Sequence, residues 1–168
     1  MNKRGNERLL KLATFLETSV KPKAFDLNVI CKINRTDDYG NSTAASDKDV
    51  ALVLKEISKG NKKYDCGTAA CAIGHMPLCF PRTFEYKENN WGGNGYIEVE
   101  NRNSGEQNFD AAKDFFNIDD TESYYLFQPD CYPHGHKSPK YVAGRIRSFV
   151  KNGLTGKKRA EVRIMSGN

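Results

Sequence analysis

The sequence lacks any apolar run that approaches the roughly 20 residues needed to cross a membrane. Its first residues, MNKRGNERLLKLATFLE, carry charges throughout and so lack the continuous apolar segment of a secretory signal. The five cysteines are an odd number, which argues against a complete disulfide framework. These absences lead us to expect a cytoplasmic protein with reduced thiols and no membrane partner.

Complete catalytic and metal-binding motifs are lacking as well. No CxxC pair occurs, and the cysteine spacing differs from that of zinc knuckles and ribbons. The segment CGTAAC lacks the Lys-Ser/Thr pair that follows the second glycine of a P-loop, and no acyl-transfer signature surrounds Cys66. Without a complete catalytic set, the sequence favours a binding protein over an enzyme.

Charge of both signs is present, with 26 basic and 21 acidic residues and a formal net charge of +5. The positive excess increases toward the C-terminus. This mild balance favours anionic partners such as nucleotides or RNA, although solvated surfaces without such a partner often share it.

The length of 168 residues, with 38% hydrophobic and 11% aromatic residues, predicts one domain with an apolar core. We expect a single globular domain over residues 1–153. Residues 154–168 are basic, and we expect them to form a flexible C-terminal tail.

Hydrophobic periodicity predicts the secondary structure. Apolar residues at three- and four-residue steps, with capping residues and helix breakers, predict helices over residues 9–20, 46–60, 109–116, 119–129 and 138–153. Alternating residues predict a strand over 25–33 and a hairpin around NNWGGNG, residues 89–95. The predicted fold class is α+β, an α-rich single domain with about five helices and a small antiparallel β-hairpin.

The segment YDCGTAACAIGHM, residues 64–76, combines two cysteines, two glycines and a histidine with small alanines. One interpretation is a thin buried helix that begins near Asp65 or Thr68 and stops at Pro77. Its small side chains would then let another element approach closely. On this interpretation the segment is a scaffold rather than a reactive centre.

A zinc site is the second interpretation of this segment. Cys71 and His75 are four residues apart and would share one face of a helix. Zinc binds Cys and His ligands in sets of four, and a later loop supplies more of them. The candidate ligands are Cys71, His75, Cys131, His134 and His136. We expect no cofactor, with zinc as the alternative.

Two further interpretations concern the start of the same segment. A thiolate at Cys66 could be activated by a helix N-terminus, with His75 or the 134–136 loop as base. Alternatively, the backbone amides of Cys66, Gly67 and Thr68 could hold a phosphate at a helix start. The residues alone leave the scaffold, metal, nucleophile and anion interpretations open.

Five short motifs carry a resemblance to a known group of proteins. They are Phe25-Asp26, a CGTxxCxxG core at 66–74, an AxxFF(G/N)I helix at 112–118, LFxP at 126–129 and a closing helix at 138–153. In this order they resemble small, largely uncharacterised proteins of bacteriophages and bacteria. Members often carry Trp at the position of His75, which implies packing there. The resemblance implies a phage-type origin, a host cytoplasm and a role in modulating the host.

Surface candidates lie elsewhere in the chain. Trp91, the one tryptophan, stands in a glycine-rich turn and could stack on a base or a partner, or fold back over the core. Arg145, Arg147 and Lys151 share the predicted last helix and could contact phosphates, although a solvated helix face has the same composition.

These observations lead to three functional hypotheses. The first is a non-enzymatic, phage-type binding protein that modulates a host protein or sequesters a nucleotide ligand. The second is a nucleic-acid-binding protein that uses the basic C-terminal helix and tail, and the third is a Cys/His-dependent or zinc-dependent enzyme. The candidate ligand-binding residues are Cys66, Gly67, Thr68, Trp91, Arg145, Arg147 and Lys151.

Overall fold

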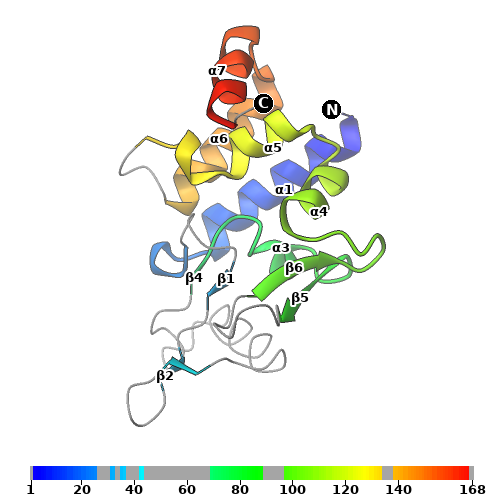
Figure 1. The fold of residues 1–168 in the computed structure, drawn as a ribbon, viewed down its shortest axis with the longest axis vertical. Helices are drawn as coiled ribbons and strands as arrows, with labels where there is room; N and C mark the ends of the chain where they lie inside the picture. The colour runs from blue at the N-terminus through cyan, green and yellow to red at the C-terminus, as the bar shows by residue number, and fades with distance from the viewer. Residues whose placement is uncertain are drawn as a thin grey trace.

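The protein is a helix-rich α+β structure in which most helices gather around a long N-terminal helix (Figure 1). The computed structural model describes residues 2–25, 31–32, 35–36, 42–43, 69–88, 97–133 and 138–166. The predicted fold class, a helix-rich α+β arrangement with a small antiparallel hairpin, is confirmed. The predicted helix over 46–60 lies outside the described residues.

Helix α1, Lys3–Ser19, supplies one wall of the core. The Asn2 side chain accepts a hydrogen bond from the Gly5 amide at 2.8 Å and so caps the first turn. The predicted apolar stripe is confirmed, because its α1 members are all fully buried: Leu9, Leu12, Ala13 and Leu16. The helix ends before Pro22, which begins the 3-10 turn η1, Pro22–Ala24.

Helix α6, Pro139–Asn152, packs along α1. The Ser138 hydroxyl accepts a hydrogen bond from the Tyr141 amide at 3.2 Å, and proline occupies the first helical position, as predicted. Arg147 of α6 donates to the Glu17 carboxylate of α1 at 2.6 Å. Gly153, with a φ of 66°, ends the helix where the sequence predicts.

Helices α4, Asn108–Phe116, and α5, Asp120–Phe127, follow one another across a tight turn. Asn117 ends α4 with a φ of 54°, a left-handed conformation that asparagine tolerates better than most residues. Asp119 accepts from the Glu122 amide at 2.9 Å, and the Glu122 carboxylate accepts from the Asp119 amide at 3.1 Å. This is the capping box that the sequence predicts.

Three antiparallel strand pairs complete the described fold. Strand β5, Phe84–Glu88, pairs with β6, Ile97–Asn101, and forms the predicted hairpin, whose turn lies outside the described residues. The other two pairs join two-residue strands: β1 (Cys31–Lys32) with β4 (Ala69–Ala70), and β2 (Arg35–Thr36) with β3 (Ser42–Thr43). The predicted strand over 25–33 includes β1 and a bridge between Phe25 and Ala70.

Residues 69–79 do not form the thin helix that the sequence predicts. They consist of β4, turns over 72–75, and a short helix α3, Met76–Cys79, which begins next to Pro77 instead of ending at it. The backbone of β4 bonds to β1 and is therefore not available for a helix. Proline suits the first turn of α3, where an amide would lack an intrahelical partner. The close packing expected of this segment is present, because residues 70–77 are all buried.

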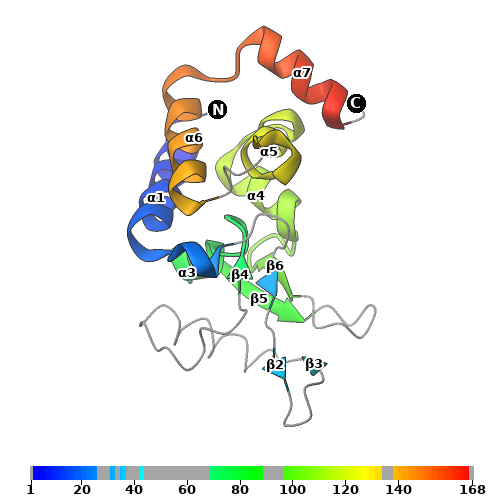
Figure 2. The same cartoon turned by 90° about the vertical axis from the view of Figure 1, so that its left-hand side faces the viewer.

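Helix α7, Gly156–Ser166, occupies most of the segment predicted to be a flexible tail (Figure 2). It lies against α5 and buries Val162, which is 1% exposed. Arg159 donates to Asp119 at 2.5 Å and to Glu122 at 2.8 Å, so the capping-box carboxylates of α5 also hold α7. The basic residue Arg159 therefore forms contacts within the protein.

We expect Arg159→Ala to loosen α7 with little effect on the rest of the fold. Partly exposed ion pairs contribute about 0.2–1 kcal/mol each, which is a large share of what holds a short terminal helix. Amide hydrogen exchange over residues 156–166 should become faster while exchange in α1 and α6 stays the same. Lys158→Ala is the matched control, because Lys158 pairs with Glu161 of the same helix. Equal exchange in the two variants would contradict a holding role for Arg159.

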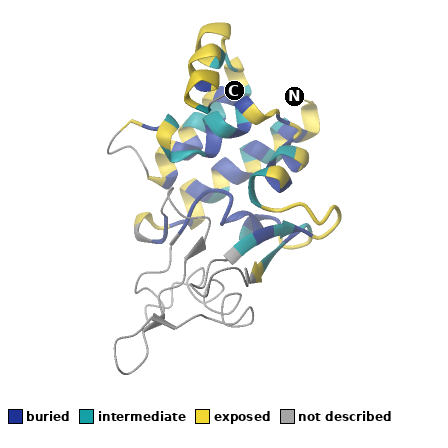
Figure 3. Ribbon diagram, viewed as in Figure 1, coloured by how far each residue is buried: buried dark blue, intermediate teal, exposed yellow. Residues whose placement is uncertain are grey.

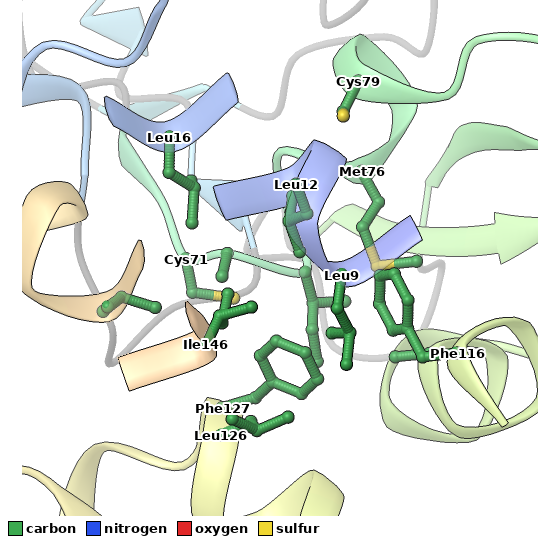
Figure 4. Close-up of a cluster of buried hydrophobic side chains, with 14 of the residues drawn as sticks. Leu9, Leu12, Leu16, Cys71, Met76, Cys79, Phe116, Leu126, Phe127 and Ile146 are labelled. Carbon is green, nitrogen blue, oxygen red and sulfur yellow. The ribbon is translucent and has the colours of Figure 1, made fainter. Parts of the chain in front are cut away.

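The apolar core lies where α1, α4, α5, α6 and residues 71–79 meet (Figures 3 and 4). Figure 4 shows the Cys71 side chain pointing into this cluster, whose labelled members are Leu9, Leu12, Leu16, Met76, Cys79, Phe116, Leu126, Phe127 and Ile146. Among the helices described, none has the length and apolar character required to traverse a bilayer.

Candidate functional site

A cleft of about 570 Å³ opens along one side of α6. It is lined by Tyr125 of α5 and by six residues of α6 and its cap: Ser138, Lys140, Tyr141, Gly144, Arg145 and Ser148. Tyr141, Gly144 and Ser148 are separated by three and four residues, which places them on one face of the helix. The volume lies within the range of about 300–1,000 Å³ that is typical of small-ligand sites.

The Arg145 guanidinium is held in a fixed position at this cleft. Its Cζ lies 3.6 Å from the centre of the Tyr132 ring and 4.8 Å from the centre of the Tyr125 ring. Nη1 also donates a hydrogen bond to the Tyr125 carbonyl at 3.1 Å. Arginine has five N–H donors, so this arrangement leaves others for a ligand. Stacking between rings reduces the side-chain freedom that binding would otherwise remove.

The electrostatic character of the cleft is positive. Lys140 adds a second cation to Arg145, and none of the described lining residues is Asp or Glu. Arg145 forms no ion pair within the part of the chain that the structure describes. Burial raises the pKa of the Tyr132 phenol, opposed in part by Arg145, so the ring beneath the guanidinium stays neutral at neutral pH. The positive charge of the described lining is therefore suited to an anionic ligand.

Aromatic and hydroxyl groups surround these cations. Tyr141 keeps 37% of its surface exposed and meets Tyr132 edge-on, with ring centroids 6.1 Å apart. Ser138 and Ser148 add hydroxyl groups at the two ends of the lining. A surface that combines fixed cations, exposed aromatic area and hydroxyls can bind an anionic ligand that also carries a flat ring.

Of the three basic residues predicted to contact phosphates, only Arg145 lines the cleft. Arg147 donates to Glu17 and, at 3.0 Å, to the Thr14 hydroxyl, which ties α6 to α1. Lys151 is exposed near the end of α6 and is not among the residues that line the cleft. The three side chains thus have different surroundings although they share one helix.

His75 is a buried neutral residue in the structure. It is 4% exposed, its ring is stacked 6.0 Å from that of Phe25, and Nε2 lies 3.1 Å from the Ala24 carbonyl oxygen. That contact requires Nε2 to carry the ring proton. Burial lowers the pKa of His75 to about 4, although the carbonyls of Ala24 and Ala70 act in the opposite direction. The side chain therefore joins the end of α1 to the start of α3.

The sulfur and histidine candidates for zinc do not form a cluster among the described residues. Cys71 is 2% exposed in the core, and Cys131 lies half-buried in the 3-10 turn η3, Pro129–Cys131. Within the described part of the chain no three Cys, His, Asp or Glu side chains come together as metal ligands would. His134 and His136, the remaining candidates, lie outside it.

Cys79 and Cys131 do not have the character of activated nucleophiles. Burial raises the pKa of the Cys79 thiol to about 11, and burial likewise raises the pKa of Cys131. Cys66, Gly67 and Thr68, which carried the nucleophile and anion interpretations, lie outside the described residues, as does Trp91.

Sequence reasoning missed Tyr125 and Tyr132 as the partners of Arg145, and Tyr141 as a residue that lines the cleft. The spacing of Tyr141, Arg145 and Ser148 on one helix was visible in the sequence. The position of Tyr125 beside Arg145 was not visible, because it depends on how α5 packs against α6.

Comparison of the chain with models of protein families, with curated protein sequences and with solved structures found no match.

Proposed function

We propose that the protein is a non-enzymatic binding protein that sequesters a nucleotide in the cleft between α5 and α6. The observation that carries this proposal is the position of Arg145. Its guanidinium is fixed between two tyrosine rings at a cleft of about 570 Å³, without an acidic partner among the described residues. A nucleotide supplies both the anion and the flat ring that this surface complements.

The chemistry of the lining favours binding over turnover. Its described members are two tyrosines, two serines, a glycine, a lysine and an arginine, with no carboxylate, imidazole or thiol among them. The commonest general bases are His, Asp and Glu, and a serine, lysine or tyrosine that acts as a nucleophile needs such a base or a lowered pKa to activate it. Sequestration of a nucleotide without chemical change needs only the groups that are present.

The resemblance to phage proteins suggests a purpose for such binding. A phage-type protein that removes a signalling nucleotide from solution would modulate its host without modifying any host protein. The alternative of a host protein as the partner predicts retention of a protein from host lysate, together with no affinity for nucleotides.

We expect Arg145→Gln to weaken nucleotide binding about 10- to 100-fold, because hydrogen bonds to charged groups contribute about 1.5–3 kcal/mol. Isothermal titration calorimetry with adenosine and guanosine monophosphates, their triphosphates and a cyclic dinucleotide would identify the tightest ligand and measure this loss. Lys151→Gln is the matched control, since it removes the same charge from the same helix outside the cleft.

Three results would count against the proposal. Binding of no nucleotide by the unaltered protein would refute it, and so would an equal loss of affinity in both variants. Chromatography of the nucleotide after long incubation should recover it unchanged, and a steady yield of product would show an enzyme instead.

Nucleic-acid binding by the basic C-terminal region has less support than nucleotide binding. Three of its cations are engaged within the chain, because Arg147, Lys158 and Arg159 pair with carboxylates. If that function were correct, single-stranded RNA would bind with an affinity that falls steeply with salt concentration. A mononucleotide held in a cleft by one or two cations would show a much shallower salt dependence.

A further inference from the structure

Gly144 occupies an interior position of α6 for which the protein fold gives no reason. Glycine in the middle of a helix is less favourable than alanine by roughly 0.5–1 kcal/mol. A Cβ atom built at Gly144 would meet no described atom within 4 Å, so no neighbouring element requires its absence. Its φ does not lie in the left-handed range, so an L-residue would adopt the same backbone without strain.

Gly5 of α1, in contrast, is a helical glycine that the packing of a neighbouring helix requires. A Cβ atom at Gly5 would collide with the Phe116 carbonyl oxygen, because α4 approaches the backbone of α1 at that point. Close approach of another group is one of the main uses of glycine. Among the described residues no side chain or neighbouring element approaches Gly144, but the residue lines the cleft that Arg145 borders.

We infer that a planar ring of the ligand lies against the bare backbone at Gly144, a position that we call the ring seat. The inference rests on the proposed function and adds where the base of the nucleotide lies. Tyr141 and Ser148 lie three and four residues from Gly144 on the same face of α6, so the ring would lie flat between them. Lys140 and Arg145 flank this position and would receive the phosphate.

The ligand class follows from this seat. A flat aromatic ring gains dispersion contacts by lying directly on a helix surface that carries no side chain, and it can also contact the Tyr141 ring. A sugar phosphate or free phosphate would gain nothing from the missing Cβ, since the two cations alone would bind it. The cleft is therefore assigned to mononucleotides, with the nucleobase recognised by α6 and the phosphate by Lys140 and Arg145.

The test compares glycine variants and ligand fragments. Gly144→Ala and Gly144→Leu place carbon over the seat, and overpacking of this kind costs about 5-fold in affinity for alanine and 50-fold or more for leucine. The probes are adenosine monophosphate, ribose 5-phosphate and inorganic phosphate, measured by calorimetry. The unaltered protein should bind adenosine monophosphate at least about 10-fold more tightly than either ring-free probe.

The thermal stability of the Gly144→Ala variant is an independent readout, because it should increase while the affinity for the nucleotide decreases. Gly144→Ala should raise the midpoint of thermal unfolding by about 2 °C, because alanine favours the helix and meets no obstacle. Gly156→Ala is the control, since that glycine of α7 also has open space around it and does not line the cleft. It should leave adenosine monophosphate binding unchanged.

The outcomes separate this inference from the proposed function. If adenosine monophosphate binds and Gly144→Ala and Gly144→Leu bind it as well as the unaltered protein does, the ring seat is wrong while nucleotide binding stands. Equal affinity for ribose 5-phosphate and adenosine monophosphate would also overturn the ring seat. If neither adenosine monophosphate nor any other nucleotide tested binds the unaltered protein, the proposed function fails and this inference fails with it.

Discussion

Replacing Gly5 with alanine should destabilise the protein by about 3 kcal/mol or more, at the upper end of what overpacking usually costs. The added methyl group would lie well inside van der Waals contact with the Phe116 carbonyl oxygen and 3.0 Å from the carbonyl carbon. Both are backbone atoms, so no flexible side chain can move aside. Either α1 must separate from α4 or one helix must bend.

The contact that would open is part of a larger attachment between these helices. Arg8, one turn after Gly5, donates to the Phe115 carbonyl at 2.5 Å, and its Cζ lies 4.0 Å from the centre of the Phe115 ring. Separation at Gly5 would therefore strain a second interaction beside it. The side chains of Phe115 and Phe116 are also members of the core, which extends the effect beyond the surface.

Urea unfolding followed by circular dichroism would measure the change in the free energy of unfolding. Gly144→Ala is the matched comparison, because it makes the same substitution inside another helix with open space around the new methyl group. The two variants should shift stability in opposite directions. A Gly5→Ala variant within about 0.5 kcal/mol of the unaltered protein, which is the usual effect of a surface substitution, would contradict the close contact.

Local signals predicted much of the helical structure. The apolar stripe of α1, the capping box of α5 and the Ser138-Pro139 start of α6 each depend on residues close together in the sequence. Such signals have a direct physical basis, since an orphan amide needs an acceptor within a few residues. The predicted β5–β6 hairpin rests on the same kind of short-range information.

The predictions that failed depended on contacts distant in sequence. Ala69 and Ala70 favour a helix by intrinsic preference, yet they pair with Cys31 and Lys32, almost 40 residues earlier. The helix over residues 156–166 is held by Arg159, which donates hydrogen bonds to Asp119 and Glu122 of α5. Local patterns contain no information about either partner.

The candidate site shows the same division. The sequence identified Arg145 as a cation on the last predicted helix but gave the same weight to Arg147 and Lys151. What distinguishes Arg145 is its position between the rings of Tyr125 and Tyr132. Tyr125 belongs to α5 and Tyr132 follows η3, and both come close to α6 only when the chain folds. The significance of Gly144 likewise depends on the folded chain, in which no described atom lies within 4 Å of a Cβ built there.

His75 should make the stability of the protein depend on pH between about 4 and 6.5. Burial lowers the folded-state pKa of His75 to about 4, whereas an unfolded histidine has a pKa of 6.5. Below pH 6.5 the unfolded chain takes up a proton that the folded chain does not, so protonation favours unfolding. The stability contributed by neutral His75 is complete above pH 6.5 and is lost as pH falls toward 4. The expected loss from pH 7 to pH 4 is about 3 kcal/mol.

The structural cause of this dependence is the fully buried imidazole between Phe15 and Phe25. Nε2 has the Ala24 carbonyl as its partner, while Nδ1 has no hydrogen-bond partner among the described residues. A second ring proton on Nδ1 would place a positive charge among aromatic rings, where the Ala70 carbonyl offsets only part of the lost solvation. Protonation should therefore separate the end of α1 from the start of α3.

His75→Gln tests this cause directly, because glutamine does not titrate yet keeps an amide that can donate to Ala24. Urea unfolding of both proteins at several pH values would give the difference in their stabilities. That difference removes the contributions of carboxylates such as Glu17 and Glu100, whose pKa values are lowered by their cationic partners in both proteins. The advantage of the histidine protein should shrink by about 3 kcal/mol as pH falls from 7 to 4. If the stability curves of the two proteins against pH were parallel, His75 would have the same pKa in the folded and unfolded states. That result would contradict the burial of a neutral imidazole.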